Sequence, residues 1–430
     1  MPAPEARLQQ GREKRKAASR TQLGALDLHK RRFKPIDVLL AAAAGRVPKL
    51  LPIKYGRMSK SPFAFFRGAV SIMAADLASE PHTGIFVQLC GDGHVQNLGC
   101  YEAPDGRLVF DINDFDETIP GPWEWDVKRM AASLVLAGLE SDHRRSECGG
   151  AVEAFAANYT ATIESLAAQP VLVYARHQIH RAKRTPAVSA AIQQAQRANP
   201  CELLSKYTDS AGHFKKIEHA LWRVRGEEKN AVLGSLDLYR QSLAPERLHL
   251  FEFFRPLDVA FKVVGTGSVG LRDYIVLMEG NGAGDLLFLQ IKQEVESAYA
   301  PYLKMGRHPN QGRRVAEGQR KVQPVSDLLL GWTRIGENDY AVRQLNDHKG
   351  SVDLTKLKAG GLEGLALVAG ELLARGHARS GDPLSIRAYI GSGDKVAKAI
   401  VRYGLEYASI AEADFERFTQ AIGEQKVKII

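Results

Sequence analysis

Two acidic segments joined by a short hairpin limit the folds open to this chain. The first, residues 90–97 (CGDGHVQN), follows an apolar run at 84–89 that predicts a buried strand. The second, residues 110–117 (FDINDFDE), overlaps another apolar run at 108–112, and the turn sequence at 104–106 predicts a hairpin between the two segments. The pattern therefore arranges three acids and an amide in order around a pair of strands.

These residue types suit metal-assisted phosphoryl transfer. An acidic group must receive or orient the proton of the acceptor, and an amide and a carboxylate must hold the Mg²⁺ that neutralises phosphate charge. The order GDxHxxN, short hairpin, hydrophobic-Asp-Phe resembles the aminoglycoside and choline kinase-like branch of the protein-kinase-like superfamily.

The resemblance implies a role for each polar residue of the two segments. Asp92 would be the catalytic base, and His94 would support its loop. Asn97 and Asp114 would hold Mg²⁺, with Asp116 as a further candidate metal ligand. For any one of these residues alone, a turn-capping role is the simpler interpretation.

A third match concerns a helix that Pro122 is expected to open. Asp126, twelve residues after Asp114, stands where those kinases have an aspartate that braces the catalytic loop. Two residues depart from the pattern, since Cys90 replaces a histidine and Asp116 replaces a glycine.

Two other metal-site patterns fail. An EF-hand loop that started at Asp111 would need Gly at its sixth position and Glu at its twelfth, where the chain has Asp116 and Pro122. A dinuclear phosphatase needs further histidine clusters, and the segment at 376–379 (GHAR) lacks a second histidine.

A kinase also needs a glycine-rich loop and a strand lysine over the nucleotide phosphates. Residues 265–270 (GTGSVG) lie between apolar runs at 259–264 and 274–278, which predicts a strand–turn–strand, whereas a dinucleotide fold would need a helix next. The candidate nucleotide-binding residues in this region are Gly265, Gly267, Ser268, Gly270, Lys292, Arg343 and Gln344.

Simpler interpretations of this region stay open. The glycines alone would suit a flexible hairpin, and Lys292, at the end of the run 286–291, could face solvent. If Lys292 is internal, its spacing does not choose between three acidic partners, Glu294, Glu296 and Glu317.

The catalytic segment precedes the glycine-rich segment, so a kinase-like chain would be circularly permuted. The colinear alternative, with Asp382 as base, fails because the fifth residue after it is Arg387 instead of Asn. The resemblance thus implies an α+β, protein-kinase-like two-lobe fold with a small antiparallel β lobe inserted between helical segments. The expected divisions are a basic disordered tail (1–45), a mainly helical lobe (46–250), a β-rich nucleotide lobe (251–350) and a closing helical segment (351–430).

Longer phrases are similar to the bacterial family called domain of unknown function 2252, over roughly residues 50–410. The family name carries no activity, so the function rests on the site itself. The phrases are Arg57-Met58, Ser61-Pro62-Phe63, Arg67-Gly68, GDGHVQN, NDFDET, GPWEWD at 121–126, Lys128-Arg129 and HARSGD at 377–382.

The distribution of charge and the number of cysteines indicate the possible partners and the cellular compartment of the protein. Residues 1–34 hold ten basic and three acidic residues, so +7 of the net charge of +9 lies in this segment, which could touch nucleic acid or an acidic surface. Four scattered cysteines and the absence of a long apolar run suggest a cytoplasmic protein without a membrane span.

The sequence therefore predicts an ATP- and Mg²⁺-dependent phosphotransferase that binds a nucleotide and an unknown small-molecule or protein acceptor. Two alternatives stay open. One is nucleotidyl transfer to a protein (AMPylation), and the other is a catalytically weak pseudokinase that binds nucleotide or acts as a scaffold.

Overall fold

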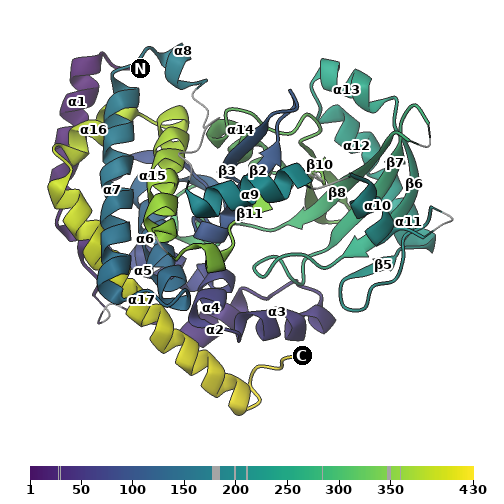
Figure 1. Ribbon diagram of the computed structural model, residues 1–430, viewed down its shortest axis with the longest axis horizontal. Coiled ribbons are helices and arrows are strands. Elements are labelled where there is room, and N and C mark those ends of the chain that lie inside the picture. Colours follow the sequence, from purple (N-terminus) through teal and green to yellow (C-terminus); the bar gives the residue numbers. More distant parts are fainter. Residues whose placement is uncertain are drawn as a thin grey trace.

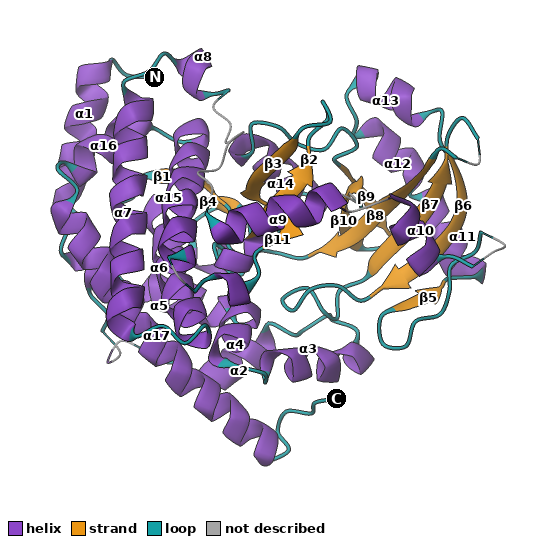
Figure 2. Ribbon diagram, in the orientation of Figure 1, coloured by secondary structure: helices purple, strands orange, loops and turns teal. Residues whose placement is uncertain are grey.

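The protein consists of a helical body and a β-sheet lobe, which lie side by side in Figure 1. The computed structural model describes residues 1–27, 29, 31–176, 185–197, 200–209, 212–282, 284–345, 350–358 and 360–430. Figure 2 shows the long helices gathered on the left, and the large sheet with shorter helices around it on the right. The predicted α+β class is confirmed, and the strands of the described sheets pair antiparallel.

Long helices from both halves of the chain build the body. They are α6 (Trp123–Glu140), α7 (Arg145–Ala167), α15 (Gly361–Ser380) and α17 (Asp394–Gly423). Leu134, Val152 and Leu372 are fully buried in their common core. Because α6 and α7 precede the sheet lobe and α15 and α17 follow it, the two halves fold as one packing unit.

The sheet lobe contains six strands in the order β5-β6-β7-β8-β10-β9. Alternate residues of a strand face opposite sides of a sheet. Val276 therefore joins a core with Tyr239, while its neighbour Ile275 joins a second core with Phe214. The strands are β5 (Leu221–Arg223), β6 (Arg255–Lys262), β7 (Asp273–Glu279), β8 (Leu286–Glu294), β9 (Gly331–Ile335) and β10 (Asn338–Gln344).

The lobe begins earlier than the expected residue 251, since β5 pairs with β6. Helices that precede β6 supply part of its core, including Tyr239 of α12. A further helix, α14 (Gln311–Val322), which the sequence analysis did not predict, packs against β8, β9 and β10.

Two small sheets hold the acidic segments where the body meets the lobe. β1 (Phe86–Leu89) pairs with β4 (Ile119–Pro122). β2 (Leu98–Glu102) and β3 (Leu108–Ile112) form the predicted hairpin, and β11 (Gly350–Ser351) adds to the free edge of β2. Residues 90–97 and 113–118 are thus the turns that connect these two sheets.

The N-terminal segment is folded, which corrects the expected disordered tail. α1 (Pro4–Glu13) packs against α16 (Pro383–Ile390). The approach is close, because a Cβ added at Gly11 would lie 2.3 Å from the backbone oxygen of Ser385. α1 has no apolar stripe, which is why periodicity did not reveal it.

Two of the basic residues of this segment, Arg7 and Arg31, form ion pairs with acids of the body. The Nε atom of Arg7 donates to Asp382 at 3.1 Å. Arg31 donates to Asp76 at 2.8 Å and to Asp414 at 2.6 Å. These cations are therefore partners of buried or half-buried carboxylates in the body.

Shorter helices complete the structure. Among the described residues, none of the helices combines the length and apolar character that a membrane crossing requires. The shorter helices are α2 (Pro35–Ala41), α3 (Leu51–Met58), α4 (Pro62–Gly68), α5 (Val70–Ser79), α8 (Val171–Tyr174), α9 (Pro186–Arg197), α10 (Pro200–Tyr207), α11 (Gly226–Gly234), α12 (Leu236–Gln241) and α13 (Pro245–Phe251).

Candidate active site

The acidic segments and the glycine-rich segment line one cavity of about 580 Å³. Gly270 lies outside the lining, and its carbonyl accepts from the backbone N–H of Val47 at 2.7 Å. The structure therefore brings together segments about 150 residues apart in the sequence. The predicted site residues in the lining are Asp92, His94, Asn97, Asp114, Asp116, Gly265, Gly267 and Ser268.

The loop that carries Asp92 is fixed at two points. Gly91 has φ +85°, and a Cβ there would lie 2.2 Å from the backbone oxygen of Glu117, so the two acidic segments touch through backbone. The carboxylate of Asp126, at the start of α6, accepts from the N–H groups of Cys90 at 2.8 Å and Gly91 at 3.0 Å. Asp126 is thus in contact with the loop it was expected to brace.

Asp92 is paired with a buried arginine of α6. Its Oδ1 atom accepts from Nε of Arg129 at 2.7 Å. Burial raises the pKa of Asp92, but the charge and hydrogen bond of Arg129 and the other nearby cationic groups together outweigh burial, so this pKa lies below its ordinary value. His94 lies 3.7 Å from Oδ2 of Asp92, and burial lowers the pKa of His94 to about 3. An ionised carboxylate therefore faces a neutral imidazole.

Asn97 and Asp114 offer the donors of a magnesium site. The Nδ2 group of Asn97 donates to the backbone oxygen of Asp92 at 2.8 Å, which leaves its Oδ1 atom as the free end. Burial and the charge of Asp116 raise the pKa of Asp114, so a cation beside this carboxylate would relieve repulsion.

Mg²⁺ keeps several waters and needs only one or two protein carboxylates. Over the described parts of the chain, no three His, Cys, Asp or Glu side chains group as a complete metal cage. Asn97 and Asp114, one amide and one carboxylate, therefore suffice as the protein ligands of a Mg²⁺ ion that keeps several waters.

Asp116, predicted as a metal ligand, forms an ion pair with Lys292 on β8. Its Oδ2 atom also accepts from Oγ of Ser268 at 2.8 Å. Burial would raise the pKa of Asp116 and lower that of Lys292, yet their mutual attraction reverses both shifts. Lys292 is only 6% exposed, which excludes the interpretation of it as a solvent-facing residue.

The three glutamates considered as partners of Lys292 lie elsewhere or act at longer range. Glu317 of α14 pairs with Arg313 at 2.7 Å, and Glu296 is exposed. Glu294 is buried on the same strand as Lys292 without a direct ion pair to it among the described contacts.

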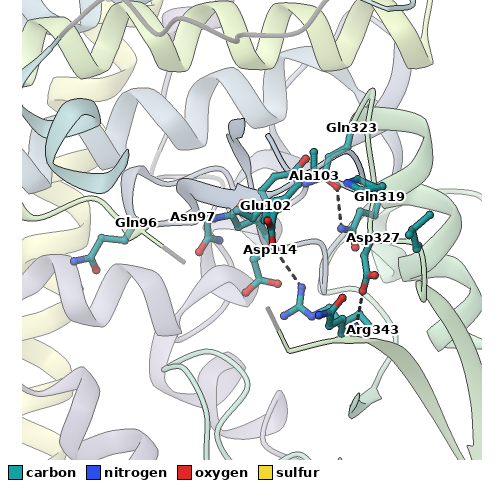
Figure 3. A pocket seen from close by; sticks show the side chains of 15 residues that line it. Gln96, Asn97, Glu102, Ala103, Asp114, Gln319, Gln323, Asp327 and Arg343 are labelled. Atoms are coloured by element: carbon teal, nitrogen blue, oxygen red, sulfur yellow. Dashed lines mark hydrogen bonds between the residues drawn. The ribbon is translucent and has the colours of Figure 1, made fainter. Parts of the chain in front are cut away.

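A second cavity, of about 460 Å³, shares Asn97 and Asp114 with the first. Arg343 and Gln344 at the end of β10 line it, and Figure 3 shows Arg343 near Asp114. The Nε atom of Arg343 donates to Gln290 at 3.0 Å. Residues 346–349, which follow this strand, lie outside the described residues. The other polar lining residues are Gln96, Glu102, Asn113, Gln319, Gln323 and Asp327.

Cations from the start of the body hold the glycine-rich segment. Arg46 donates to the backbone oxygen of Gly267 at 2.8 Å, and Lys54 of α3 donates to the same oxygen at 3.0 Å. Arg57 donates to the backbone oxygen of Gly265. These contacts could not be predicted from the sequence, because every residue has a backbone oxygen and residue type does not show which of them accepts a hydrogen bond. α3 is the helix drawn between the body and the sheet lobe in Figure 1.

One known protein family matches most of the residues in this fold. The family described as "Uncharacterized protein conserved in bacteria (DUF2252)" matches residues 46–421. The chain belongs to this family. No curated protein and no solved structure matches the chain.

The DUF2252 match confirms the family resemblance seen over residues 50–410. It begins at Arg46, the first of the cations that hold the glycine-rich segment, and ends within α17. α1 lies outside the DUF2252 region, whereas all the predicted site residues and the whole lining of the second cavity lie within it. The lining of the first cavity also includes Leu39, Ala41, Ala42 and Ala44, which precede the matched region.

Proposed function

We propose that this DUF2252 protein is an ATP- and Mg²⁺-dependent phosphotransferase of the protein-kinase-like type, with the catalytic segment ahead of the nucleotide lobe. The observation that carries the proposal is the contact between Lys292 and Asp116. It joins the strand after the glycine-rich hairpin to the acidic turn that carries Asp114. Kinases need this set of groups around one metal-bound nucleotide.

The order of elements in the sheet lobe supports the proposal. A glycine-rich turn joins β6 to β7, a buried lysine lies on the next strand β8, and α14 follows before β9 and β10. Protein kinases have a glycine-rich loop, a third-strand lysine and a helix after it. The difference is the acidic partner of Lys292, which comes from Asp116 and not from the helix.

The arrangement suits transfer of a terminal phosphoryl group. Residues 265–268 and Lys292 would hold the phosphates, and Mg²⁺ held by Asn97 and Asp114 would neutralise their charge. The acceptor oxygen would bond to the γ-phosphorus as the bond to the β–γ bridging oxygen breaks and ADP leaves. The acceptor proton would pass to Oδ2 of Asp92, because the Arg129 contacts use Oδ1.

One observation favours a catalytically weak pseudokinase as the second candidate. The Arg129 contact lowers the pKa of Asp92, and a weaker base accepts a proton less readily. The loose transition state of phosphoryl transfer tolerates such a base, because the proton moves late. This tolerance is why we favour an active phosphotransferase.

The decisive experiment incubates the purified protein with Mg²⁺, a lysate of the source cell and ATP labelled at the γ- or the α-phosphate. We expect transfer of the γ label by the wild type and by Asp105→Asn, an exposed acid of the same hairpin, but not by Asp114→Ala. Transfer of the α label would indicate nucleotidyl transfer. Binding of ATP without transfer of either label would support the pseudokinase.

A further inference from the structure

Lys54 is a buried cation in the wall of the first cavity. Its side chain is 3% exposed and lines the cavity together with Asp92 and Ser268. Its hydrogen bonds go to neutral backbone oxygens, of Gly267 at 3.0 Å and of Thr266 and Gly68 at 3.4 Å. Burying an ammonium group without an opposite charge is costly, so this position favours a ligand that supplies one.

Arg67 of α4 lines the same wall. Its Nε atom is buried without a hydrogen-bond partner. Among the residues that the structure describes, its guanidinium has no recorded hydrogen bond or ion pair. A planar guanidinium with free donors matches the oxygen atoms of a phosphate or carboxylate.

The acids of the cavity act on this wall only at longer range. The charges of Asp92 and Asp114 favour the charged form of Arg67, but among the described contacts neither acid forms an ion pair with Arg67 or Lys54. Asp92 is paired with Arg129, and Asp116 is paired with Lys292. Glu117 accepts from the backbone N–H of Ala298 at 2.7 Å, and burial raises its pKa. Burial also lowers the pKa of Lys54 well below its ordinary value, which an incoming anion would reverse.

We propose that Lys54 and Arg67 form an oxyanion subsite of the catalytic cavity, which binds a phosphate or carboxylate group. The role of this anion rests on the proposed function. It is either the terminal phosphate of the nucleotide or an anionic group of the acceptor, and the two sources share one chemistry. In the second case the acceptor is a phosphorylated or carboxylated molecule.

The direct test titrates inorganic phosphate into the full-length protein by calorimetry, with and without Mg²⁺ and ADP. We expect Lys54→Met and Arg67→Gln each to weaken phosphate binding about tenfold, the loss of one charged hydrogen bond. Lys60→Met, which removes an exposed lysine near α3, should leave it unchanged. Asp114→Ala should keep phosphate binding while losing transfer, which separates the subsite from the proposed function.

A second comparison identifies the source of the anion. If Lys54→Met weakens binding of a non-hydrolysable ATP analogue but not of ADP, the subsite holds the terminal phosphate. The other result is that Lys54→Met binds ADP and the ATP analogue as tightly as the wild type does, but binds phosphate more weakly in the presence of the analogue. In that case the subsite binds the acceptor.

Two results would overturn the subsite: no phosphate binding by the wild type, or phosphate binding by both variants that is as tight as that of the wild type. Should Lys54→Met not fold, acetylation of Lys54 in the wild type can be followed by mass spectrometry. Phosphate should slow that acetylation but not the acetylation of Lys60. An unchanged rate at Lys54 would also overturn the proposal.

Discussion

The ammonium group of Lys292 contacts the carboxylate of Asp116, which lies 176 positions earlier in the chain. The same carboxylate accepts from Ser268. One acid thus ties β8 and the glycine-rich segment to the turn that carries Asp114. The position of the lysine is therefore set by the acidic segment of the body, and a shift of α14 alone would not release it.

Replacing Lys292 by Met should weaken nucleotide binding by about tenfold or more, because a charged partner of the phosphates is lost. Binding of a non-hydrolysable ATP analogue measures this effect. Lys216→Met, at an exposed lysine of the same lobe, is the matched control. Equal affinities of the two variants would remove Lys292 from the nucleotide site.

Asp92→Asn should lower the rate of transfer by about 10²–10⁴-fold, since the carboxylate that receives the proton is lost. Single-turnover transfer of labelled phosphate measures the rate, and circular dichroism checks the fold. A rate equal to that of the wild type would contradict the assignment of Asp92 as the base.

Asp126→Ala should destabilise the protein, because the buried N–H groups of Cys90 and Gly91 lose their acceptor. Each unsatisfied buried donor costs about 1–3 kcal/mol. Urea unfolding measures the loss, and hydrogen exchange should accelerate at these two amides. Asp126→Asn retains one acceptor and should recover part of the stability. Unchanged exchange in Asp126→Ala would show that the loop is held by other contacts.

Asp273 should make the stability of the sheet lobe depend on pH. Burial raises its pKa to about 6 in the folded protein, against about 3.9 in an unfolded chain. The folded state therefore binds the proton more tightly. This contribution to stability is full below about pH 4 and is lost as the pH rises to about 6.

The loss from Asp273 should amount to about 2–3 kcal/mol. Urea unfolding measures the free energy of unfolding of the wild type relative to that of Asp273→Asn. This difference should fall between about pH 4 and about pH 6 and stay level above about pH 6. A difference that is constant with pH would mean that Asp273 is not buried as described.

Arg31→Met should destabilise the protein by about 3–5 kcal/mol, because Asp76 and Asp414 would remain buried without their shared cation. Thermal unfolding compared with Arg32→Met, at an exposed neighbour, tests this effect. Similar melting temperatures for the two variants would show that Arg31 does not stabilise the body through these ion pairs.

Local patterns in the sequence predicted the elements of the site but not its long-range pairs. The strand before Asp92, the β2–β3 hairpin and the β6–β7 glycine turn follow from apolar runs and turn residues. The partners of Asp92 and Lys292 do not, since ion pairs between distant segments have no period. The ion pair between Asp116 and Lys292 was therefore not predicted, although both residues were named as site residues.

The N-terminal segment and helix α14 are two further features that sequence patterns did not predict. α1 is polar on all sides and docks through ion pairs and close backbone contact, so its hydrophobic pattern carried no signal. The helix α14 buries an arginine, Arg314, whose guanidinium donates to the backbone oxygen of Asp116 at 2.8 Å. Its buried face is therefore partly polar, and the helix has too few apolar residues to form an apolar run in the sequence.

The buried pair of Asp111 and Arg375 has a consequence for synthesis on the ribosome. The two residues are 264 positions apart, and both are fully buried. The β2–β3 hairpin therefore leaves the ribosome long before Arg375, the cation that neutralises Asp111, and α7 emerges long before α15, which covers it. A nascent chain that ends in the sheet lobe exposes the apolar face of α7. We expect chaperones to bind such a chain until its last helices have been synthesised.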